Sequence, residues 1–411
     1  MIDFFCPQPQ KLDSLRSGPL GPHLEGFAAL LARQGYCQIY RWRKLRLAAA
    51  LGQWLEKRRL HLCQLDEQQA NAFLQRWQQR HRFSGDSYTL TMLLQHLRQN
   101  GVIPAIVPPI EESGFMGDLI RDYEQFLRQE RGLLPVTIHE CVRVARRFLR
   151  HRFTKGQIQL RQLGASDAAD FILRVSPGYG HRYLQSLTSR LRVFFRFLLQ
   201  RGHMAAPLVD TIPTVAARQL SHVPRYMEAR DVEKTLGSCD RRTKIGKRDY
   251  AVLLLLARLG LRASEVARLG LEDVDWRAGE VCVRGKGQRL DRLPLPKDVG
   301  EAIASYLKIR PCGATTRRVF LRDKAPYEGL VAETVGSVVD RALTRVRLYP
   351  PHRGAHLLRH SLATHMLQSG VSMAQISQVL RHQSAQTTMI YAKVDLNALR
   401  LLAQPWPGGA Q

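Results

Sequence analysis

The sequence has no apolar run long enough to cross a membrane and no secretory signal peptide, so we expect a cytoplasmic protein. Its seven cysteines are scattered, without a CxxC or CxxH pair, which indicates neither a disulfide framework nor a zinc site. Acidic residues are few: 35 Asp and Glu face 62 Lys and Arg, which gives a formal net charge of +27. A basic chain with 45% hydrophobic residues should fold and bind a polyanion, nucleic acid first and a membrane surface second.

Proline and glycine divide the 411-residue chain into domains. Helical periodicity begins at residue 23 and stops at the proline-rich residues 104–114, which are typical of a linker. A second helical segment ends at Gly202, and three prolines within residues 206–225 predict a second linker. The predicted domains are residues 1–103, an N-terminal helical module; residues 115–205, a helical DNA-binding domain; and residues 225–404, a catalytic domain.

Two stretches of the helical segments resemble each other. Residues 62–74, LCQLDEQQANAFL, align with residues 160–172, LRQLGASDAADFI, and each segment ends at a glycine that is soon followed by proline. The alignment predicts an internal duplication. The alternative is that any two amphipathic helical bundles share such a pattern.

The second helical segment is strongly basic, because residues 115–224 hold 17 Lys and Arg but 8 Asp and Glu. Its arginines recur at three- and four-residue spacing, which gathers them on helix faces. Such a face usually only solvates a helix. Here the excess of positive charge predicts contacts to nucleic-acid phosphates, which position a protein without reading sequence. The predicted contact residues are Arg143, Arg146, Arg147, Arg150, Arg190, Arg192 and Arg196.

The C-terminal run HLLRHSLATHMLQSGVSMAQISQVLRHQSAQTTMIY carries the most chemistry. Its apolar spacing predicts two helices, the first ended by Gly370 and the second capped by Ser372. His356 and Arg359 are three residues apart, so on a helix they share a face and suit an anion such as phosphate. Later in the run, His382 offers a further donor and Tyr391 offers an oxygen nucleophile. The alternative is an ordinary helix pair with satisfied histidines.

A further arginine, Arg262, stands upstream, in KRDYAVLLLLARLGLRASE. The pattern predicts a buried helix from Tyr250, capped by Asp249 and ended by a glycine, and then a second helix capped by Ser264 with Glu265 in its first turn. Arg262 would then sit at a helix N-terminus, where positive potential favours anions. A structural ion pair between Arg262 and Glu265 is compatible with that function.

EVCVRGKGQRLDRLPL predicts a β-hairpin. Val281 and Val283 alternate with polar residues, a Gly-Lys-Gly turn follows, and leucines continue on the other side. Lys286 lies at the tip. A lysine in such a turn is by itself ordinary.

Together these motifs resemble the tyrosine recombinases, the phage-integrase family of DNA strand-transfer enzymes. HxxRH, LRH and a Tyr nine residues later follow GLRxSE and a hairpin Lys in the order of that family, and the resemblance covers about residues 115–402. It implies a mainly α fold with a small β-sheet or hairpin in the catalytic domain. Residues 115–202 resemble the family's helical core-binding domain, and residues 222–236 resemble the opening of its catalytic domain.

The resemblance also implies a catalytic set, which is Arg262, Lys286, His356, Arg359, His382 and Tyr391. The two arginines would clamp the scissile phosphate, and His382 would hydrogen-bond it. His356 would handle the proton of Tyr391, whose attack would leave a 3′-phosphotyrosine. Lys286 would protonate the leaving oxygen. The chemistry requires no cofactor or metal.

The implied partners are double-stranded DNA, a homo-tetramer on synapsed sites and further recombinases. An idle DNA-binding accessory protein is the alternative, and a relaxing topoisomerase is the third interpretation. One position departs from the family, which often has Gly where this chain has Arg381; its side chain would contact DNA or cap a helix. Residues 394–403 would form a helix that docks into a neighbouring subunit or folds back. The N-terminal module would bind DNA or protein.

Overall fold

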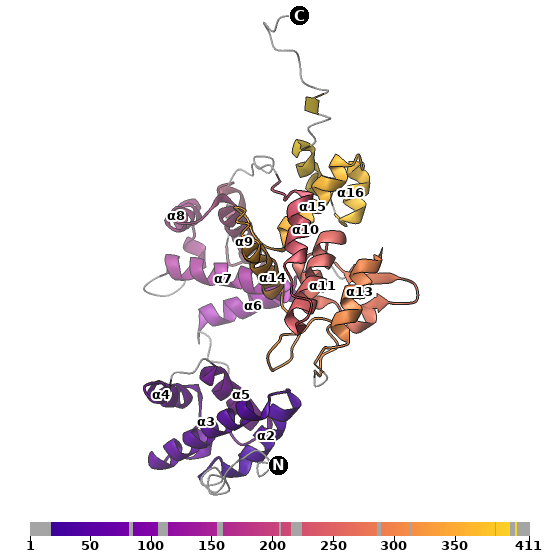
Figure 1. Ribbon diagram of the computed structural model, residues 1–411. Coiled ribbons are helices and arrows are strands. Elements are labelled where there is room, and N and C mark those ends of the chain that lie inside the picture. Colours follow the sequence, from indigo (N-terminus) through magenta and orange to yellow (C-terminus); the bar gives the residue numbers. More distant parts are fainter. Residues whose placement is uncertain are drawn as a thin grey trace, which may run out of the picture. The chain divides into compact units, whose positions relative to one another are not determined.

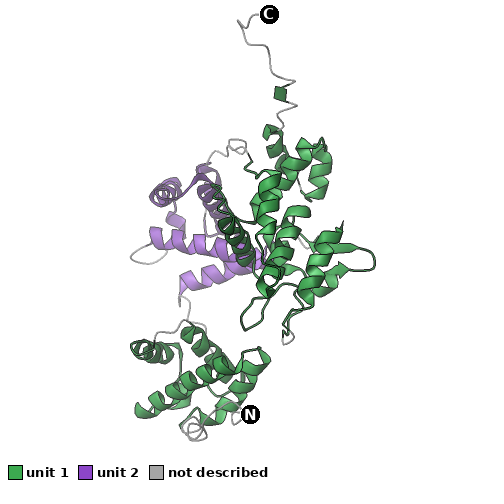
Figure 2. Cartoon of the chain, in the orientation of Figure 1, with its two compact units in different colours: residues 1–104, 222–411 green, residues 105–221 purple. Residues whose placement is uncertain are grey.

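The computed structural model describes most of the chain (Figure 1). The described residues are 18–81, 85–105, 114–153, 159–204, 207–214, 224–285, 289–311, 314–382, 384–394 and 399–400. The chain forms two compact units (Figure 2). Unit 1 combines Met1–Pro104 with His222–Gln411, and unit 2 is Ala105–Ser221.

Several sequence predictions concern residues that lie wholly or largely outside the described part. They are the linker at residues 104–114, Lys286 at the hairpin tip, and the C-terminal helix at residues 394–403. These remain predictions. The predicted linker at residues 206–225 is described in part, and there η5 (Leu208–Thr211) brings Val209 into the core of unit 2. Across the described stretches, no helix has both the length and the apolar character that a membrane span needs.

The N-terminal module of unit 1 is helical. Its described elements include α2 (Leu24–Arg33), α3 (Gln38–Lys57), η3 (Leu62–Gln64), α4 (Glu67–Gln78) and α5 (Asp86–Gln99). Asp66 caps α4, because its carboxylate accepts a hydrogen bond from the backbone N–H of Gln69 at 2.8 Å. Leucines pack with Phe27 and Phe73 in a buried core, so the apolar periodicity of this segment marks its inner faces.

Unit 2 repeats this order of elements. It contains α6 (Phe115–Gln129), α7 (Pro135–Arg152), η4 (Leu160–Gln162), α8 (Ala165–Val175) and α9 (His181–Gln200). Aromatic rings dominate its core, where Tyr123 meets Phe194 edge-on with 4.9 Å between ring centroids. The two aligned sequence stretches hold equivalent places, since each begins with a 3-10 turn and continues into a helix. This shared order supports the duplication.

The rest of unit 1 surrounds a buried helix, α11 (Lys244–Arg258). It packs against α10 (Ala229–Gly237), α13 (Lys297–Leu307), α14 (Ala332–Arg345) and α15 (Ala355–Gln368). Most of its apolar side chains are inaccessible to solvent. The helix therefore forms the centre of the core that supports the candidate site.

The predicted cap of α11 is wrong. Thr243, not Asp249, is the N-cap, because its side-chain oxygen accepts a hydrogen bond from the backbone N–H of Gly246 at 3.0 Å. Asp249 lies inside the helix, where its buried carboxylate accepts from Arg248 at 2.8 Å. An internal ion pair therefore looked like a helix start in the sequence. The helix ends as predicted, with Gly260 in the left-handed region at φ +57°.

A small antiparallel sheet completes the described part of unit 1. Its strands are β1 (Val274–Asp275), β2 (Glu280–Arg284) and β3 (Leu290–Pro294). Arg284 pairs with Leu290, which confirms the predicted hairpin, and Val281 and Val283 are buried as their alternation predicted. The two residues of β1 were too few to predict from alternation. The fold class, mainly α with a small sheet, is confirmed.

Candidate active site

The helix pair that carries most of the predicted site forms as expected. α15 starts after Gly354 and is followed by Gly370, and both glycines have positive φ angles, +115° and +82°, that other residues rarely adopt. Ser372 caps α16 (Met373–Val379), because its hydroxyl accepts from the backbone N–H of Gln375 at 3.3 Å. Both predicted helix boundaries are confirmed.

Arg359, on α15, is buried, with 4% of its surface exposed. Its guanidinium donates to the carbonyl oxygens of Gly260, which follows α11, and Leu380, which follows α16. A side chain at position 260 would not fit, since its Cβ would lie 2.8 Å from the Leu380 side chain. Burial, with the charges of Arg262 and Arg381, lowers the pKa of Arg359 to about 10, so the group stays cationic at neutral pH.

Arg262 stands at the N-cap of α12 (Ala263–Arg268). The predicted cap, Ser264, is wrong, because Ser264 already lies inside the helix. Glu265 acts in its place, accepting from the backbone N–H of Arg262 at 2.8 Å and from its guanidinium at 2.7 Å. The Arg262 side chain is 31% exposed, whereas that of Glu265 is 2% exposed. Arg262 is therefore anchored on one side and open to an anion on the other.

Arg381 neither extends into solvent nor caps a helix. Its side chain is 6% exposed and donates to Glu265 at 2.8 Å. Its φ angle of +53° lies in the left-handed region, which explains why glycine suits this position. Among the described residues, its Nε and Nη1 atoms have no hydrogen-bond partner. The departure from the family pattern is thus a second cation on the carboxylate that holds Arg262.

The charge of Glu265 is maintained inside this group. Burial raises the pKa of its carboxyl, but the hydrogen bond from the Arg262 backbone and the charges of Arg381 and Arg262 outweigh burial, so the pKa falls below its ordinary value. The carboxylate therefore fixes both guanidinium groups at neutral pH.

Tyr391 is 1% exposed and packs with Ala363, Ile376 and Leu380. Its hydroxyl lies 2.7 Å from Nδ1 of His360. Burial raises the pKa of Tyr391 to about 12, with Arg359 opposing that rise. Burial, followed by the charges of His356 and Arg359, lowers the pKa of His360 to about 4. At neutral pH a protonated phenol therefore faces a neutral imidazole, which can accept its proton.

His360 was missed as a functional residue. It belongs to the HxxRH motif, but the family resemblance assigned the tyrosine proton to His356. His356 is exposed on α15, and its ring centroid lies 6.5 Å from that of His360. Only the packing of Tyr391 against α15 identifies which histidine meets the hydroxyl.

His382 follows α16 and is held by a second residue that sequence reasoning missed. Its Nδ1 lies 2.7 Å from the hydroxyl of Thr388, which is buried in α17 (Ala385–Thr388). Burial, followed by the charges of Arg359 and Arg262, lowers the pKa of His382 to about 4. The ring is therefore neutral, and its Nε2 remains available to another group.

The structure thus brings five of the six predicted catalytic residues into one region of unit 1. Arg359 donates hydrogen bonds to the backbone after α11 and after α16. It also interacts electrostatically with Arg262, His382 and Tyr391. Lys286 lies outside the described residues, although the strands on either side of it are in place. The described part of the chain holds no cluster of His, Cys, Asp or Glu placed to bind a metal ion.

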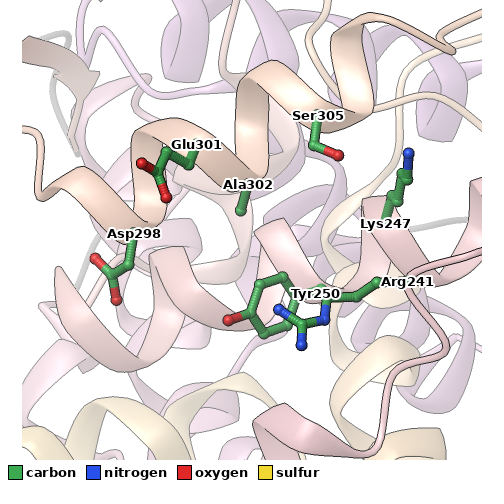
Figure 3. Close-up of a pocket in the computed structure, with 7 residues that line it drawn as sticks. All are labelled: Arg241, Lys247, Tyr250, Asp298, Glu301, Ala302 and Ser305. Carbon is green, nitrogen blue, oxygen red and sulfur yellow. The ribbon is translucent and has the colours of Figure 1, made fainter.

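A hollow in unit 1 lies between α11 and α13 (Figure 3). It has a volume of about 240 Å³ and contains none of the predicted catalytic residues. Arg241 and Lys247 are balanced there by Asp298 and Glu301, and the Arg241 guanidinium lies 4.9 Å from the ring centre of Tyr250. Because the basic and acidic side chains that line this hollow balance, it has no excess positive charge to attract an anion.

Unit 2 presents the predicted basic face. A hollow of about 370 Å³ is lined by four of the predicted arginines, all from α7, together with His139 and Val142. Arg143 donates to Glu140 at 2.6 Å, and Arg147 donates to the hydroxyl of Tyr183 at 3.4 Å. The arginines of α7 are therefore gathered at one surface.

The predicted arginines of α9 do not share one environment. Arg190 donates to the hydroxyl of Ser186, and Arg192 donates to the carbonyl oxygen of Ile212 at 2.9 Å. Arg196 is exposed. The Arg192 guanidinium thus fastens the chain after α9, which leaves fewer donors for an outside ligand.

Comparison with known proteins identifies the family of the chain. Residues 225–397 match the model of the phage integrase family. The putative integrase/recombinase y4rA of Sinorhizobium fredii (strain NBRC 101917 / NGR234) is 42% identical over 96% of each chain. Tyrosine recombinase XerD of Listeria monocytogenes serotype 4b (strain F2365) is 31% identical over 68% of this chain and 95% of that protein. The chain therefore belongs to the phage integrase family, the tyrosine recombinases, which cut and rejoin DNA strands.

Solved structures agree on the fold. The XerH site-specific recombinase, bound to a palindromic difH substrate in a post-cleavage complex, aligns with a TM-score of 0.56 and 18% identity, over 72% of this chain and 98% of XerH. A lambda integrase dimer bound to a COC′ core site aligns with a TM-score of 0.51 and 18% identity, over 67% of this chain and 94% of the solved lambda integrase chain.

Proposed function

We propose that this tyrosine recombinase exchanges strands of double-stranded DNA at specific sites through a 3′-phosphotyrosine intermediate. The observation that carries the proposal is the contact of the Tyr391 hydroxyl with His360, beside the buried Arg359. A buried phenol is a weak nucleophile with its proton in place. A neutral imidazole within hydrogen-bond distance supplies the base that activates it.

The first step follows from that contact. The Tyr391 oxygen attacks phosphorus, its proton moves to Nδ1 of His360, and the bond from phosphorus to the 5′-oxygen breaks. Because Tyr391 is 1% exposed, the segment that carries it must shift before a phosphodiester can reach the hydroxyl. We assign the base role to His360 in place of His356, whose exposed ring is free to meet the DNA.

Two arginines stabilise the transition state. Negative charge grows on the non-bridging oxygens of the phosphate, and fixed donors aimed at those oxygens lower the barrier without reorganisation. Arg262 is held by Glu265 with an open side, and Arg359 carries a positive charge in a site sheltered from water. Nε2 of His382, whose ring is oriented by Thr388, is a third donor to the same phosphate.

Lys286 protonates the departing 5′-oxygen. In the sequence it stands between β2 and β3. The ester formed on Tyr391 retains the energy of the broken bond, so a free 5′-hydroxyl can attack it and rejoin the strand without ATP. The arginines of α7 hold the duplex by its phosphates.

The larger assembly follows from the reaction. Exchange of two duplexes needs four active subunits, so we propose a homo-tetramer on synapsed sites, with partner recombinases as an extension. The reaction serves integration, excision or transposition of a mobile element. Sequencing the DNA that flanks the gene identifies the element ends and thus the substrate.

Covalent trapping tests this function. A nicked suicide duplex carrying the element end should capture the protein on a 3′ end. Tyr391→Phe should abolish the capture while binding changes little, since only one hydroxyl is removed. The products are separated on a denaturing gel, and the bound peptide is identified by mass spectrometry.

Two results would contradict the proposal. Equal trapping by Tyr391→Phe would move the nucleophile to another residue. Binding without trapping by the unmodified protein would favour an accessory DNA-binding protein that holds the duplex without cutting it.

A further inference from the structure

The N-terminal module has a surface that the strand-transfer reaction does not use. Between α3 and α4 lies a hollow of about 490 Å³. Trp54, Lys57 and Arg58 line it from the end of α3, and Arg76, Trp77 and Arg80 line it from the end of α4. We call this set of residues the α3–α4 hollow.

Aromatic rings form the base of the α3–α4 hollow. The Trp77 ring stacks on His81 with 3.9 Å between centroids and 14° between planes, and Phe73 lies 5.7 Å from Trp77 and 5.9 Å from Trp54. The indole N–H of Trp54 is buried, and it has no hydrogen-bond partner among the described residues. A buried donor without an acceptor is costly unless a ligand supplies one.

The charges of the hollow are of one sign. Its four cations, Lys57, Arg58, Arg76 and Arg80, are all exposed, and no acidic residue lines it. In the described part of the chain, none of the four forms an ion pair with a carboxylate. Like charges gathered this closely repel one another, so an anion bound among them would be stabilised.

Two other charged sites in the described part of the chain have acidic partners. Elsewhere in the same module, Arg98 forms a two-pronged ion pair with Glu67 at 2.7 and 2.9 Å. In the catalytic part, the hollow between α11 and α13 balances two basic residues with two acidic ones. The α3–α4 hollow should therefore prefer an anionic ligand, because no acidic side chain that lines it neutralises its cations.

Aromatic rings and unpaired cations together identify the class of ligand. Lys and Arg neutralise phosphates, and an indole N–H donates to a phosphate oxygen. Arg58 already lies over the Trp54 ring at 4.6 Å, so its charge is oriented by the aromatic base. A small anion would satisfy one or two of these groups, whereas a chain of phosphodiesters would satisfy them all.

We propose that the α3–α4 hollow is a second binding site for duplex DNA. It contacts the phosphodiester backbone of the duplex. It rests on the proposed function only in taking DNA as the ligand. It adds a contact outside the catalytic part and outside unit 2. The module then strengthens binding to duplex DNA and takes no part in the chemistry.

Salt dependence of binding tests the site in the full-length protein. The slope of log affinity against log salt falls by about 0.9 for each phosphate that the protein no longer neutralises. The double variant Arg76→Gln/Arg80→Gln should therefore lower the slope by about 2 on a fluorescent duplex of mixed sequence, with affinity down roughly 10- to 30-fold at physiological salt. The matched control is Arg33→Gln/Arg46→Gln, which removes two exposed arginines of the same module that do not line the hollow.

A second variant tests the aromatic base. Trp54→Phe keeps an aromatic ring in place but replaces the indole and its unpartnered N–H donor by a smaller phenyl ring, so it should weaken duplex binding a few-fold without changing the slope. Circular dichroism checks that every variant is folded.

The outcomes separate clearly. Equal slopes for the hollow variant and its control would show a general effect of net charge and overturn the site. A slope change seen only with the separated single strands would overturn the assignment to duplex DNA. Failure of Tyr391 trapping would leave these slopes untouched, so the site and the strand-transfer function can fail independently.

Discussion

Arg359 on α15 and Arg147 on α7 have the same side chain in opposite surroundings. Arg359 is 4% exposed and donates to two carbonyl oxygens that belong to distant parts of the chain. Arg147 is exposed; it donates a 3.4 Å hydrogen bond to Tyr183 and lies 5.8 Å from the ring centre of Tyr179. A fixed, sheltered charge acts on a reaction, whereas an exposed charge among others of its sign acts on binding. Substitution of the buried Arg359 should therefore slow the reaction, whereas substitution of the exposed Arg147 should weaken DNA binding.

After loss of the nucleophile, the largest effect should come from Lys286, the one predicted catalytic residue outside the described part. A sugar alkoxide is a poor leaving group, because the pKa of its conjugate acid is on the order of that of water, about 16. Lys286→Ala should therefore slow cleavage of an ordinary phosphodiester by about 10²- to 10⁴-fold. Single-turnover cleavage of the suicide duplex measures this loss.

Sulfur substitution separates an acid from a simple DNA contact. A thiol has a pKa of roughly 8.5, so a 5′-bridging sulfur leaves without a proton donor. Lys286→Ala should cut this substrate nearly as fast as the unmodified enzyme does, while Arg262→Ala should be slow on both substrates. If sulfur does not rescue Lys286→Ala, the lysine is a groove contact and the acid is another residue.

Arg359→Lys comes next, since a single ammonium cannot bridge the carbonyl oxygens of Gly260 and Leu380. Cleavage should fall by about 10²- to 10³-fold, as for other fixed donors to a transition state. Breaking these hydrogen bonds should also reduce the free energy of unfolding by about 1–3 kcal/mol. Urea unfolding and single-turnover cleavage measure the two effects.

Arg268→Lys is the matched control, because Arg268 is an exposed arginine on neighbouring α12. It should leave both quantities unchanged. Equal rates for Arg359→Lys and the control would remove Arg359 from the proposed clamp.

The comparison also explains which features the sequence could predict. Helix boundaries set by nearby residues were readable, as for Gly370 and for Ser372 with its partner three residues away. The hairpin was readable from alternation. By contrast, the partner of the Tyr391 hydroxyl is 31 residues away in sequence, and the carbonyl of Gly260 is 99 residues from Arg359. Such contacts depend on how whole helices pack, which no local pattern contains.

Local patterns also misled where charge imitated a cap. Asp249 has the composition of an N-cap but is neutralised inside α11 by Arg248. Glu265, three residues after Arg262, was correctly seen as its companion, yet it took over the capping role assigned to Ser264. Residue type alone does not reveal whether a carboxylate binds a backbone N–H or a guanidinium.

Acid should destabilise the folded protein through two histidines of the candidate site. The pKa values of His360 and His382 are both about 4 in the folded protein, against about 6.5 when unfolded. The unfolded state therefore binds more protons below pH 6.5. The stability these rings contribute is complete above that pH and is lost as pH falls towards 4, by at most about 1.4 kcal/mol per pH unit for each group.

Urea unfolding at a series of pH values measures this slope. The variant His360→Gln/His382→Gln should have a flatter profile between pH 6.5 and 4 than the unmodified protein. His139→Gln, which changes an exposed histidine of unit 2, should keep the full slope. An unchanged slope in the double variant would mean that the two rings do not titrate as their burial requires.

The smallest effects should come from the basic face of α7, where each arginine contributes one contact among several. Arg147→Ala should weaken DNA binding a few-fold, equally across sequences, and lower the log–log salt slope by about 0.9.

Arg143→Ala should weaken DNA binding less, because Glu140 already neutralises Arg143 at 2.6 Å. Arg128→Ala is the control, since Arg128 is also exposed but pairs with Glu124 on α6, which does not line the hollow. The cleavage rate at saturating protein should stay constant for all three variants, in contrast to Arg359→Lys. If the slope is unchanged for Arg147→Ala, the face only solvates its helix; if the saturated rate falls, the division between binding and reacting arginines is wrong.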